Sequence, residues 1–298
     1  NLELDCAYHL PGVARFRVNV FLQHHGIAAA LRIITDRIPS AEEIGLTPAV
    51  TKLAELPRGL VLVTGPTGSG KTTTLASLIE MINQRFSKFI VTIEDPIEFV
   101  YQNKNSVINQ REVGQHTKSF ARALKYSLRQ NPDVLLIGEM RDLETISLAI
   151  TAAETGHLCF ATLHTQDAPT TIDRMIDVFP ADQQAEIRTQ LSLVLAAVVS
   201  QALLPRKDGG RVCAREVLTM IPAAASLIRE RKASQLYGVI EAGSKYGMNS
   251  MDQALAHLVR EGAIGFEDAL GKAHDPGNLR NLVAMGSLGA AVPRQPAR

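Results

Sequence analysis

The chain has 298 residues, of which 46% are hydrophobic and 20% charged, and its formal net charge is +1. These values are typical of a globular protein with one large domain or two unequal ones. They exclude a strong overall field that would attract nucleic acid or membrane, although they are compatible with a local basic patch. Three cysteines, far apart and without CxxC spacing, favour reduced thiols in a cytoplasmic protein over a disulfide framework or a zinc site.

The N-terminal segment has the pattern of a β-hairpin. Polar and apolar residues alternate over 13–21 and predict a strand, residues 27–34 are its expected partner, and His25-Gly26 is the expected turn. We interpret residues 1–40 as the last part of a small β-rich domain, too short to form a core of its own. Several prolines follow, so residues 41–57 are predicted to form a linker with a short helix.

From Leu60 onward, short apolar runs alternate with helical segments. This alternation predicts an α/β fold, in which crossover helices cover a parallel sheet and ligands bind at the carboxyl ends of the strands. The predicted strands are 60–65, 88–95, 133–139 and 157–164, and the predicted helices begin at Lys71 or cover 117–129, 142–154 and 168–177.

The rest of the chain is predicted to be mainly helical. Residues 191–204 form the longest apolar stretch, which is too short and too polar to span a bilayer, and we interpret it as a buried helix. After Pro222 helices dominate, including one at 250–260. One domain with a helical C-terminal part would then span 58–285, and the tail at 286–298 is predicted to be disordered.

The sequence GPTGSGKT at 65–72 carries the strongest chemical signal. It follows an apolar strand and opens a helix, which is the context that a phosphate-binding P-loop requires. The glycines let the loop aim its N–H groups at phosphates, Lys71 can reach the β- and γ-phosphates, and the Thr72 hydroxyl can bind Mg²⁺. The predicted ATP-binding residues are Gly65, Pro66, Thr67, Gly68, Ser69, Gly70, Lys71, Thr72 and Thr73.

Acidic residues follow the strand at 88–95. Pro96 ends that strand, so Glu94, Asp95 and Glu98 are expected in a loop at the ligand-binding edge of the sheet. A carboxylate there can orient and deprotonate the water that attacks a phosphate. Without the P-loop, a solvated acidic loop would be the preferred interpretation.

The next two strands also carry polar residues at their ends. Gly138 takes the position where a Walker B strand usually ends in Asp, and Glu139 follows, so this carboxylate would serve Mg²⁺ through water. His157 and His164 lie seven residues apart around an apolar strand and would face opposite sides, which argues against a shared metal site. His164 at the carboxyl edge can sense the γ-phosphate. Either histidine can equally be structural, and His157 more readily so.

Together these motifs resemble the secretion-type hexameric ATPases of type II secretion and type IV pili. The resemblance rests on GPTGSGKTTT at 65–74, VTIEDPIEF at 91–99, DVLLIGEMRDLET at 133–145, TGHLCFATLHT at 155–165 and TIDRMIDVFP at 171–180. Within this family the chain is similar to the pilus retraction (PilT-type) group. YHLPGVARFRVNVF at 8–21 and KYGMNSMDQAL at 245–255 resemble that group, and a four-cysteine zinc insertion is missing from the sequence.

The resemblance implies a fold, partners and site residues. It implies a RecA-like core at 58–285 after the end of a PAS-like α+β domain, in a homohexamer that uses ATP and Mg²⁺. The hexamer would lie in the cytoplasm at the inner face of the inner membrane, bind an inner-membrane pilus platform protein, contact the membrane only through partners and bind no nucleic acid. The implied residues are catalytic Glu98, Glu139, Glu94 and His164, the histidine-box pair His157 and His164, the arginine fingers Arg17 and Arg32 with Arg111 as a weaker candidate, and the Mg²⁺ ligands Thr72 and Glu139.

One segment departs from the family pattern. Retraction ATPases carry AIRNLIRE, whereas residues 223–230 are AAASLIRE, so Ala224, Ala225 and Ser226 replace Ile-Arg-Asn. The motif is tied to retraction rather than to hydrolysis, so an accessory paralogue, a pilus assembly ATPase and a type II secretion ATPase remain alternatives. A P-loop kinase would need a phosphoacceptor site, for which the sequence shows no candidate. A nucleic-acid motor would need a basic and aromatic surface, but aromatic residues make up 5% and the sequence has no basic run. The intact acidic and histidine boxes argue against a scaffold that only binds nucleotide.

Overall fold

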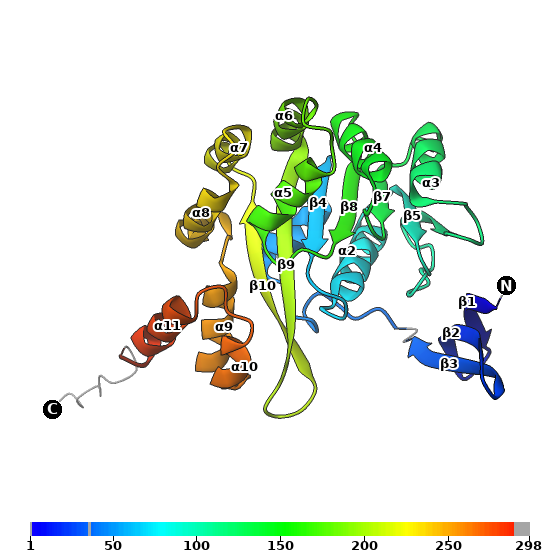
Figure 1. The fold of residues 1–298 in the computed structure, drawn as a ribbon, viewed down its shortest axis with the longest axis horizontal. Helices are drawn as coiled ribbons and strands as arrows, with labels where there is room; N and C mark the ends of the chain where they lie inside the picture. The colour runs from blue at the N-terminus through cyan, green and yellow to red at the C-terminus, as the bar shows by residue number, and fades with distance from the viewer. Residues whose placement is uncertain (1, 35–36, 289–298) are drawn as a thin grey trace. The chain divides into compact units, whose positions relative to one another are not determined.

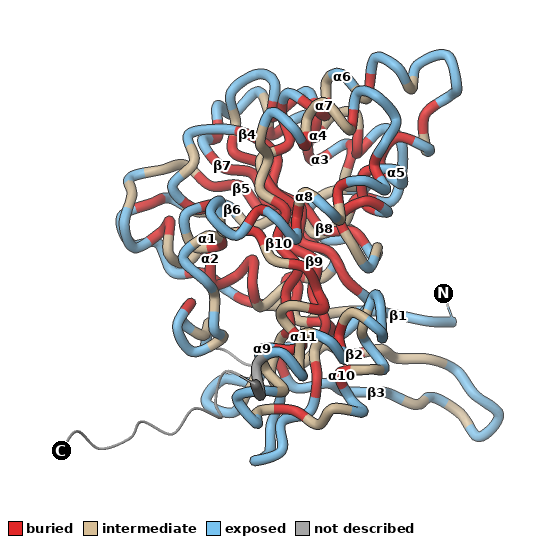
Figure 2. The backbone as a smooth tube through the Cα atoms, turned by 90° about the vertical axis from the view of Figure 1, so that its left-hand side faces the viewer, coloured by how far each residue is buried: buried red, intermediate tan, exposed pale blue. Residues whose placement is uncertain are grey.

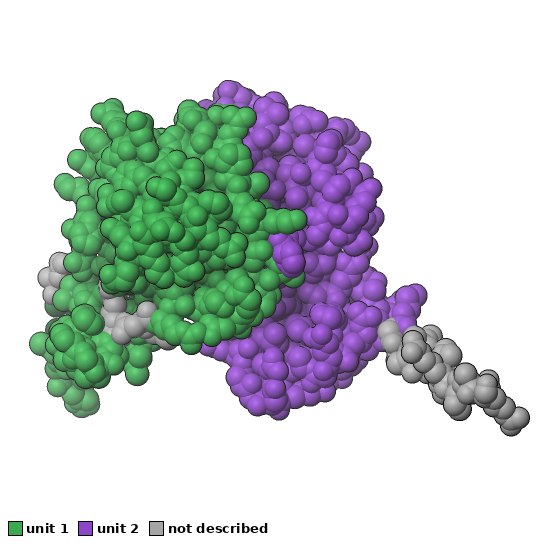
Figure 3. All heavy atoms as spheres, turned by 180° about the vertical axis from the view of Figure 1, so that it is seen from behind, with its two compact units in different colours: residues 1–47, 51–62, 72–163 green, residues 48–50, 63–71, 164–298 purple. Residues whose placement is uncertain are grey.

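The computed structural model describes residues 2–34 and 37–288, which divide into two compact units (Figure 3). Unit 1 contains Asn1–Thr47, Thr51–Leu62 and Thr72–Leu163, and unit 2 contains Pro48–Val50, Val63–Lys71 and His164–Arg298. The domain boundaries predicted at residues 40, 57 and 285 stay predictions. The short helix expected in the linker is present as α1 (Pro48–Thr51) and the 3-10 turn η1 (Lys52–Glu55).

The N-terminal segment forms a three-stranded antiparallel sheet in the order β1-β2-β3. Its strands are β1 (Glu3–Leu10), β2 (Ala14–Gln23) and β3 (Gly26–Ile34). The two predicted strands are therefore present, whereas β1 was not predicted. The predicted turn is wrong by one residue, because Gly26 pairs with Gln23 and leaves His24 and His25 as the two-residue connection.

A seven-stranded sheet has the order β10-β9-β4-β8-β7-β5-β6. Strand β5 pairs in parallel with β6 and β7, and β7 pairs in parallel with β8, which confirms the parallel α/β core, whereas β9 and β10 are antiparallel. Every residue of β4, β7 and β8 is buried (Figure 2), as expected for strands covered on both faces. The strands are β4 (Gly59–Thr64), β5 (Phe89–Glu94), β6 (Val107–Glu112), β7 (Val134–Ile137), β8 (Leu158–Leu163), β9 (Leu195–Pro205) and β10 (Arg211–Thr219).

The predicted crossover helices of unit 1 are present: α2 (Lys71–Arg85), α3 (Phe120–Ser127), extended by η2 (Leu128–Gln130), and α4 (Leu143–Glu154). Two of them begin at a side-chain cap, where Ser119 accepts from the Arg122 amide and Asp142 from the Thr145 amide. Helices α3 and α4 pack on each other, α3 also contacts β5, and α4 also contacts β8 (Figure 1). These contacts bury the apolar faces of both helices.

The helix predicted at 191–204 is wrong. The helix α6 (Gln184–Val194) ends early in this stretch, and the chain continues as β9. A short apolar run has no periodicity that separates a buried strand from a buried helix. The β-branched pair Val198 and Val199 favours the strand, and pairing with β10 through the turn at 206–210 decides it.

Unit 2 is mainly helical after Pro222, as predicted. Helix α5 matches the predicted 168–177, and α9 begins at a capping box made by Ser250 and Gln253. Helix α11 extends into the predicted disordered tail, of which residues 289–298 lie outside the described residues. Within the described ranges, no helix is long and apolar enough to cross a membrane. The helices are α5 (Ala168–Asp177), α7 (Pro222–Arg229), η3 (Ala233–Gln235), α8 (Leu236–Ala242), η4 (Ser244–Tyr246), α9 (Met251–Arg260), α10 (Phe266–Leu270) and α11 (Pro276–Leu288).

Candidate nucleotide-binding site

The predicted P-loop connects β4 to α2 in a strand–loop–helix arrangement. Gly65, Gly68 and Gly70 have φ angles of +138°, +80° and +91°, which residues with a side chain rarely adopt. Gly65 also has a packing reason, because a β-carbon there would lie 2.4 Å from the backbone oxygen of Gln201 on β9. The loop geometry therefore depends on glycine both for its turn and for its close approach to β9.

Lys71 is the first residue of α2, and its side chain folds back onto the loop. The Nζ atom donates to the carbonyl oxygens of Gly65 at 2.7 Å and Pro66 at 3.0 Å. Only 9% of the residue is exposed, so the ammonium is held in place at the loop rather than extended into solvent. A phosphate that binds here would meet a charge that is already positioned.

The loop residues fit a nucleotide triphosphate. Glycines with positive φ let a loop of this kind aim its backbone amides at a phosphate, and the N-terminus of α2 favours an anion next to Lys71. Thr72 follows Lys71 in the first turn of α2 and is half-buried. This is the position from which a P-loop hydroxyl binds Mg²⁺, and bound Mg²⁺ would supply positive charge to the phosphates.

The acidic segment at the end of β5 lies in unit 1, and its three carboxylates differ in their exposure to solvent. Asp95 is exposed, Glu98 is half-buried and Glu94 is buried at 6% exposure. Glu94 accepts a hydrogen bond from Thr92 Oγ1 at 2.6 Å and another from Gln110 Nε2 at 3.2 Å. Burial raises the pKa of Glu94 to about 7. Glu98 therefore remains the most accessible carboxylate of the predicted catalytic pair Glu94 and Glu98.

The unusual Walker B segment has a steric explanation. The amide of Gly138 donates to the Ile93 carbonyl at 2.7 Å, and a β-carbon at Gly138 would lie 3.0 Å from the same oxygen. An aspartate at this position would press against β5, which accounts for glycine. The strand β7 ends at Ile137, two residues earlier than predicted, so Glu139 lies in the loop that follows. Its partly buried carboxylate forms an ion pair with the exposed Arg141.

The two histidines bracket β8, as expected. His157 Nδ1 contacts the Ala152 carbonyl at 2.9 Å and Thr155 Oγ1 at 3.2 Å, so its ring binds the last turn of α4. This contact supports a structural role for His157. His164 directly follows the carboxyl end of β8. A residue that senses the γ-phosphate, as predicted for His164, is expected at this edge of the sheet.

The two predicted arginine fingers are neighbours in the N-terminal sheet. Arg17 on β2 and Arg32 on β3 are directly opposed, and Ala7 of β1 is the other neighbour of Arg17. Opposed like charges destabilise a strand pair, so an anion bound between them would stabilise this face. Arg111 on β6 instead contacts the carbonyl oxygens of His116 and Ala123 within unit 1, both at 3.4 Å.

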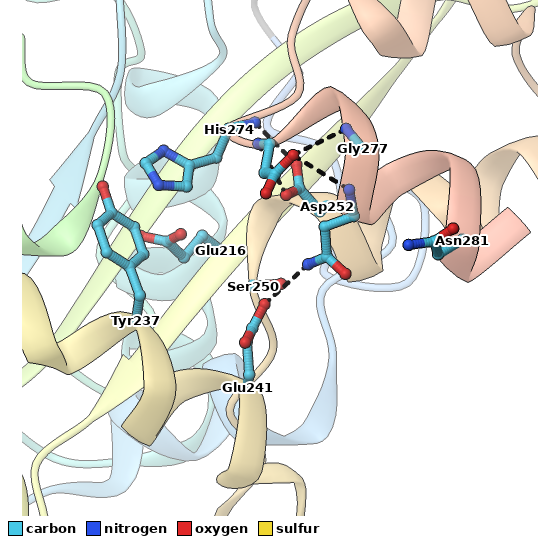
Figure 4. Close-up of a pocket in the computed structure, with 10 residues that line it drawn as sticks. Glu216, Tyr237, Glu241, Ser250, Asp252, His274, Gly277 and Asn281 are labelled. Atoms are coloured by element: carbon cyan, nitrogen blue, oxygen red, sulfur yellow. Dashed lines mark hydrogen bonds between the residues drawn. The ribbon is translucent and has the colours of Figure 1, made fainter.

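A cavity of about 550 Å³ in unit 2 lies outside the predicted site (Figure 4). Glu216 on β10 is 1% exposed and accepts from the amide of Ala168, the first residue of α5, at 2.8 Å. The ring of Tyr237 stacks on His274 at 4.0 Å between centroids, and Asp252 accepts from the His274 amide. Burial, together with the nearby carboxylates, raises the pKa of Glu216 to about 7.

We expect Glu216 to make unfolding stability depend on pH. Its folded pKa of about 7 exceeds the usual 4.5, so the folded state binds more protons between these values and stability falls as pH rises from about 4.5 to 7. At about 1.4 kcal/mol per pKa unit, the loss of stability is at most roughly 3.5 kcal/mol. Urea unfolding of Glu216→Gln at pH 5 and pH 8 should show a flatter profile than the parent protein. The exposed Glu241→Gln is the control, and equal slopes for all three proteins would contradict the prediction.

This protein is a P-loop ATPase by class. The class is defined by the strand–P-loop–helix arrangement together with the acidic segments that follow β5 and β7. The family model described as "Type II/IV secretion system protein" matches residues 9–238. The chain therefore belongs to the type II/IV secretion ATPase family.

Individual relatives agree with this placement. The chain is 50% identical over 278 residues to the "Type IV pilus retractation ATPase PilT" of Pseudomonas aeruginosa, covering 93% of this chain and 81% of that protein. It is 55% identical over 276 residues to the "Twitching motility protein" of Neisseria gonorrhoeae, covering 92% and 74%. The crystal structure of the pilus retraction motor PilT with bound ADP matches with a TM-score of 0.89 at 49% identity, covering 94% and 80%. These likenesses confirm the predicted RecA-like α/β core and an ATPase that uses nucleotide.

Proposed function

We propose that this protein is a Mg²⁺-dependent ATPase that acts as a homohexameric motor and powers type IV pilus retraction. The observation that carries the proposal is an intact P-loop, with Lys71 held at the loop carbonyls, in a chain half identical to a pilus retraction ATPase over most of its length. The hexamer would work in the cytoplasm at the inner face of the inner membrane. It would contact the membrane only through a pilus platform protein.

The predicted site residues have different roles in ATP hydrolysis. Lys71 and the loop amides would bind the phosphates, Thr72 and Glu139 would hold Mg²⁺, the latter through water, and Glu98 would orient the attacking water. Glu98 suits this role because it is the half-buried carboxylate of its segment, open to a water molecule yet held by its neighbours. Arg17 and Arg32 would bind the nucleotide as a pair, and His164 would respond to the γ-phosphate.

The altered retraction motif lies on α7 beside a groove. Ala223, Ser226 and Leu227 line it together with residues of α8, and its volume is about 660 Å³. Ala224 is fully buried, so isoleucine at this position would overpack the α7 contact by about 1–3 kcal/mol. Ala225 and Ser226 are half-buried and can accept longer side chains.

Deletion of the gene tests whether this ATPase powers pilus retraction or pilus assembly. We expect deleted cells to be hyperpiliated and unable to twitch, because retraction stops while extension continues. The wild-type chain should restore twitching, and Lys71→Ala should not. Bald cells would contradict retraction and indicate assembly. Rescue only by Ala225→Arg/Ser226→Asn, with Ala224 left in place, would indicate an accessory paralogue.

One surface feature bears on the nucleic-acid alternative. Arg122 and Arg129 lie 5.6 and 5.7 Å from the ring of Tyr126, and Lys125 is exposed beside them on α3. These basic residues are three or four positions apart, so they do not form a basic run in the sequence. Residues at this spacing come together on one face only when the segment is helical. ATPase rates with and without DNA separate a nucleic-acid motor, which DNA would stimulate, from a pilus motor.

A further inference from the structure

The segment that carries Glu98 is attached to β6 by two side chains. Glu112 Oε2 accepts from the Ile97 amide at 3.1 Å, on one side of Glu98. Gln110 Nε2 donates to the Phe99 carbonyl at 2.8 Å, on the other side. The neighbours of Glu98 in the chain are therefore both held by β6.

Gln110 makes two more contacts with the same region. Its Oε1 atom accepts from the Tyr101 amide at 2.9 Å, and its Nε2 atom lies 3.2 Å from Glu94 Oε1. The side-chain amide of Gln110 thus connects Glu94 at the end of β5 with Phe99 and Tyr101, which follow Glu98 in the chain.

The segment bonded to β6 is largely buried, although Gln110 itself is half-buried. Ile97, Phe99 and Tyr101 are exposed by 6%, 9% and 8%, and Glu112 by 5%. Removing one of the two side chains takes away the hydrogen-bond partner of a backbone group in this buried segment, which costs most where the bond itself is buried, as between Glu112 and Ile97. Glu98 itself is half-buried, so the segment is rigid around a carboxylate that remains accessible.

We propose that Gln110 is a positioning residue for ATP hydrolysis, which fixes the backbone of the Glu98 segment and thereby the Glu98 carboxylate. Glu112 fixes the preceding residue in the same way. This inference rests on the proposed catalytic role of Glu98. Gln110 does not act on substrate. Its effect passes through Glu98, and a carboxylate displaced by about 1 Å can lose a factor of about 100 in rate.

The test replaces Gln110 by methionine, which keeps the volume and removes all three hydrogen bonds. We expect kcat to fall by about 10- to 100-fold while KM for ATP and the affinity for ADP, measured by calorimetry, change less than about threefold. Asn109→Met, at an exposed position on the same strand, is the matched control and should keep the parental rate. An unchanged kcat, or a rise in KM that accounts for the loss, would overturn the proposal.

A double-mutant cycle separates positioning from a general structural role. In a Glu98→Gln background, Gln110→Met should reduce the remaining rate by less than about twofold, because the group it positions is already gone. The full additional loss in that background would overturn the inference while leaving the role of Glu98 intact. If Glu98→Gln alone had the normal rate, the proposed function of Glu98 would fail first.

Glu112 gives a second test if Gln110→Met does not fold. Glu112→Gln keeps an acceptor for the Ile97 amide and should retain most of kcat, whereas Glu112→Leu removes the acceptor and should lose about tenfold or more at unchanged KM. Equal rates for these two variants would contradict the proposal that Glu112 fixes the backbone of the Glu98 segment.

Discussion

Replacing Lys71 by alanine should abolish nucleotide binding and hydrolysis in this protein. The ammonium is the positive charge of the P-loop, and its two contacts with loop carbonyls show that it is positioned before phosphate arrives. Its removal takes away a charge-assisted hydrogen bond to phosphate and the stabilisation of charge in the transition state. The latter alone is worth about 100- to 1,000-fold in rate for a comparable donor. We expect ADP binding below calorimetric detection and ATP turnover at background.

The control for Lys71 is another lysine of the same chain. The side chain of Lys88 is 41% exposed and pairs with Asp133 at 3.3 Å, an interaction worth between about 0 and 1 kcal/mol. Lys88→Ala should therefore keep both ADP affinity and turnover. Thermal melting of both variants checks that neither is unfolded. Turnover by a folded Lys71→Ala protein at the parental rate would contradict the assignment of the nucleotide site.

Glu98→Gln should separate binding from chemistry. Glutamine keeps the shape of the side chain but cannot accept a proton, so we expect kcat to fall by about 100- to 10,000-fold. ADP affinity should change little, because Glu98 is not assigned to the phosphates. Single-turnover hydrolysis together with ADP calorimetry measures both quantities. A normal rate would remove Glu98 from the mechanism.

Glu94→Gln is the informative comparison, because the resemblance implies a catalytic role for Glu94 as well. Glu94 is buried and already accepts hydrogen bonds from Thr92 and Gln110, which suits an anchor better than a base. We therefore expect Glu94→Gln to lose less rate than Glu98→Gln and to change the melting temperature more. Asp95→Asn, at an exposed position, serves as the neutral control.

The elements that the sequence predicted well are those with local signals. The helix predicted at 168–177 is α5 to the residue, with Asp167 as its N-cap and Pro169 near its start. The helix predicted at 142–154 begins one residue later because Asp142 is its cap. Capping residues, glycine turns and strongly apolar strands carry their structural preference within a few residues, so pattern reasoning recovers them.

The elements that were missed depend on distant partners. Strand β9 was mistaken for a helix, and β6 and β10 were not predicted, because only pairing with another strand distinguishes them. Gln110 was missed for the same reason. A polar residue on an unremarkable strand gives no signal until folding brings Phe99 and Tyr101 to its side chain.

The P-loop, the acidic and histidine residues and the α/β class could all be inferred from the amino-acid sequence. These depend on residue type and spacing within short segments. The folded chain was needed to see that β5 leaves no room for a side chain at Gly138 and that Arg17 lies opposite Arg32. It was also needed to see that Glu94 is buried while Glu98 is accessible. Burial and cross-strand contacts arise between residues far apart in the chain, so they become defined only when the chain is folded.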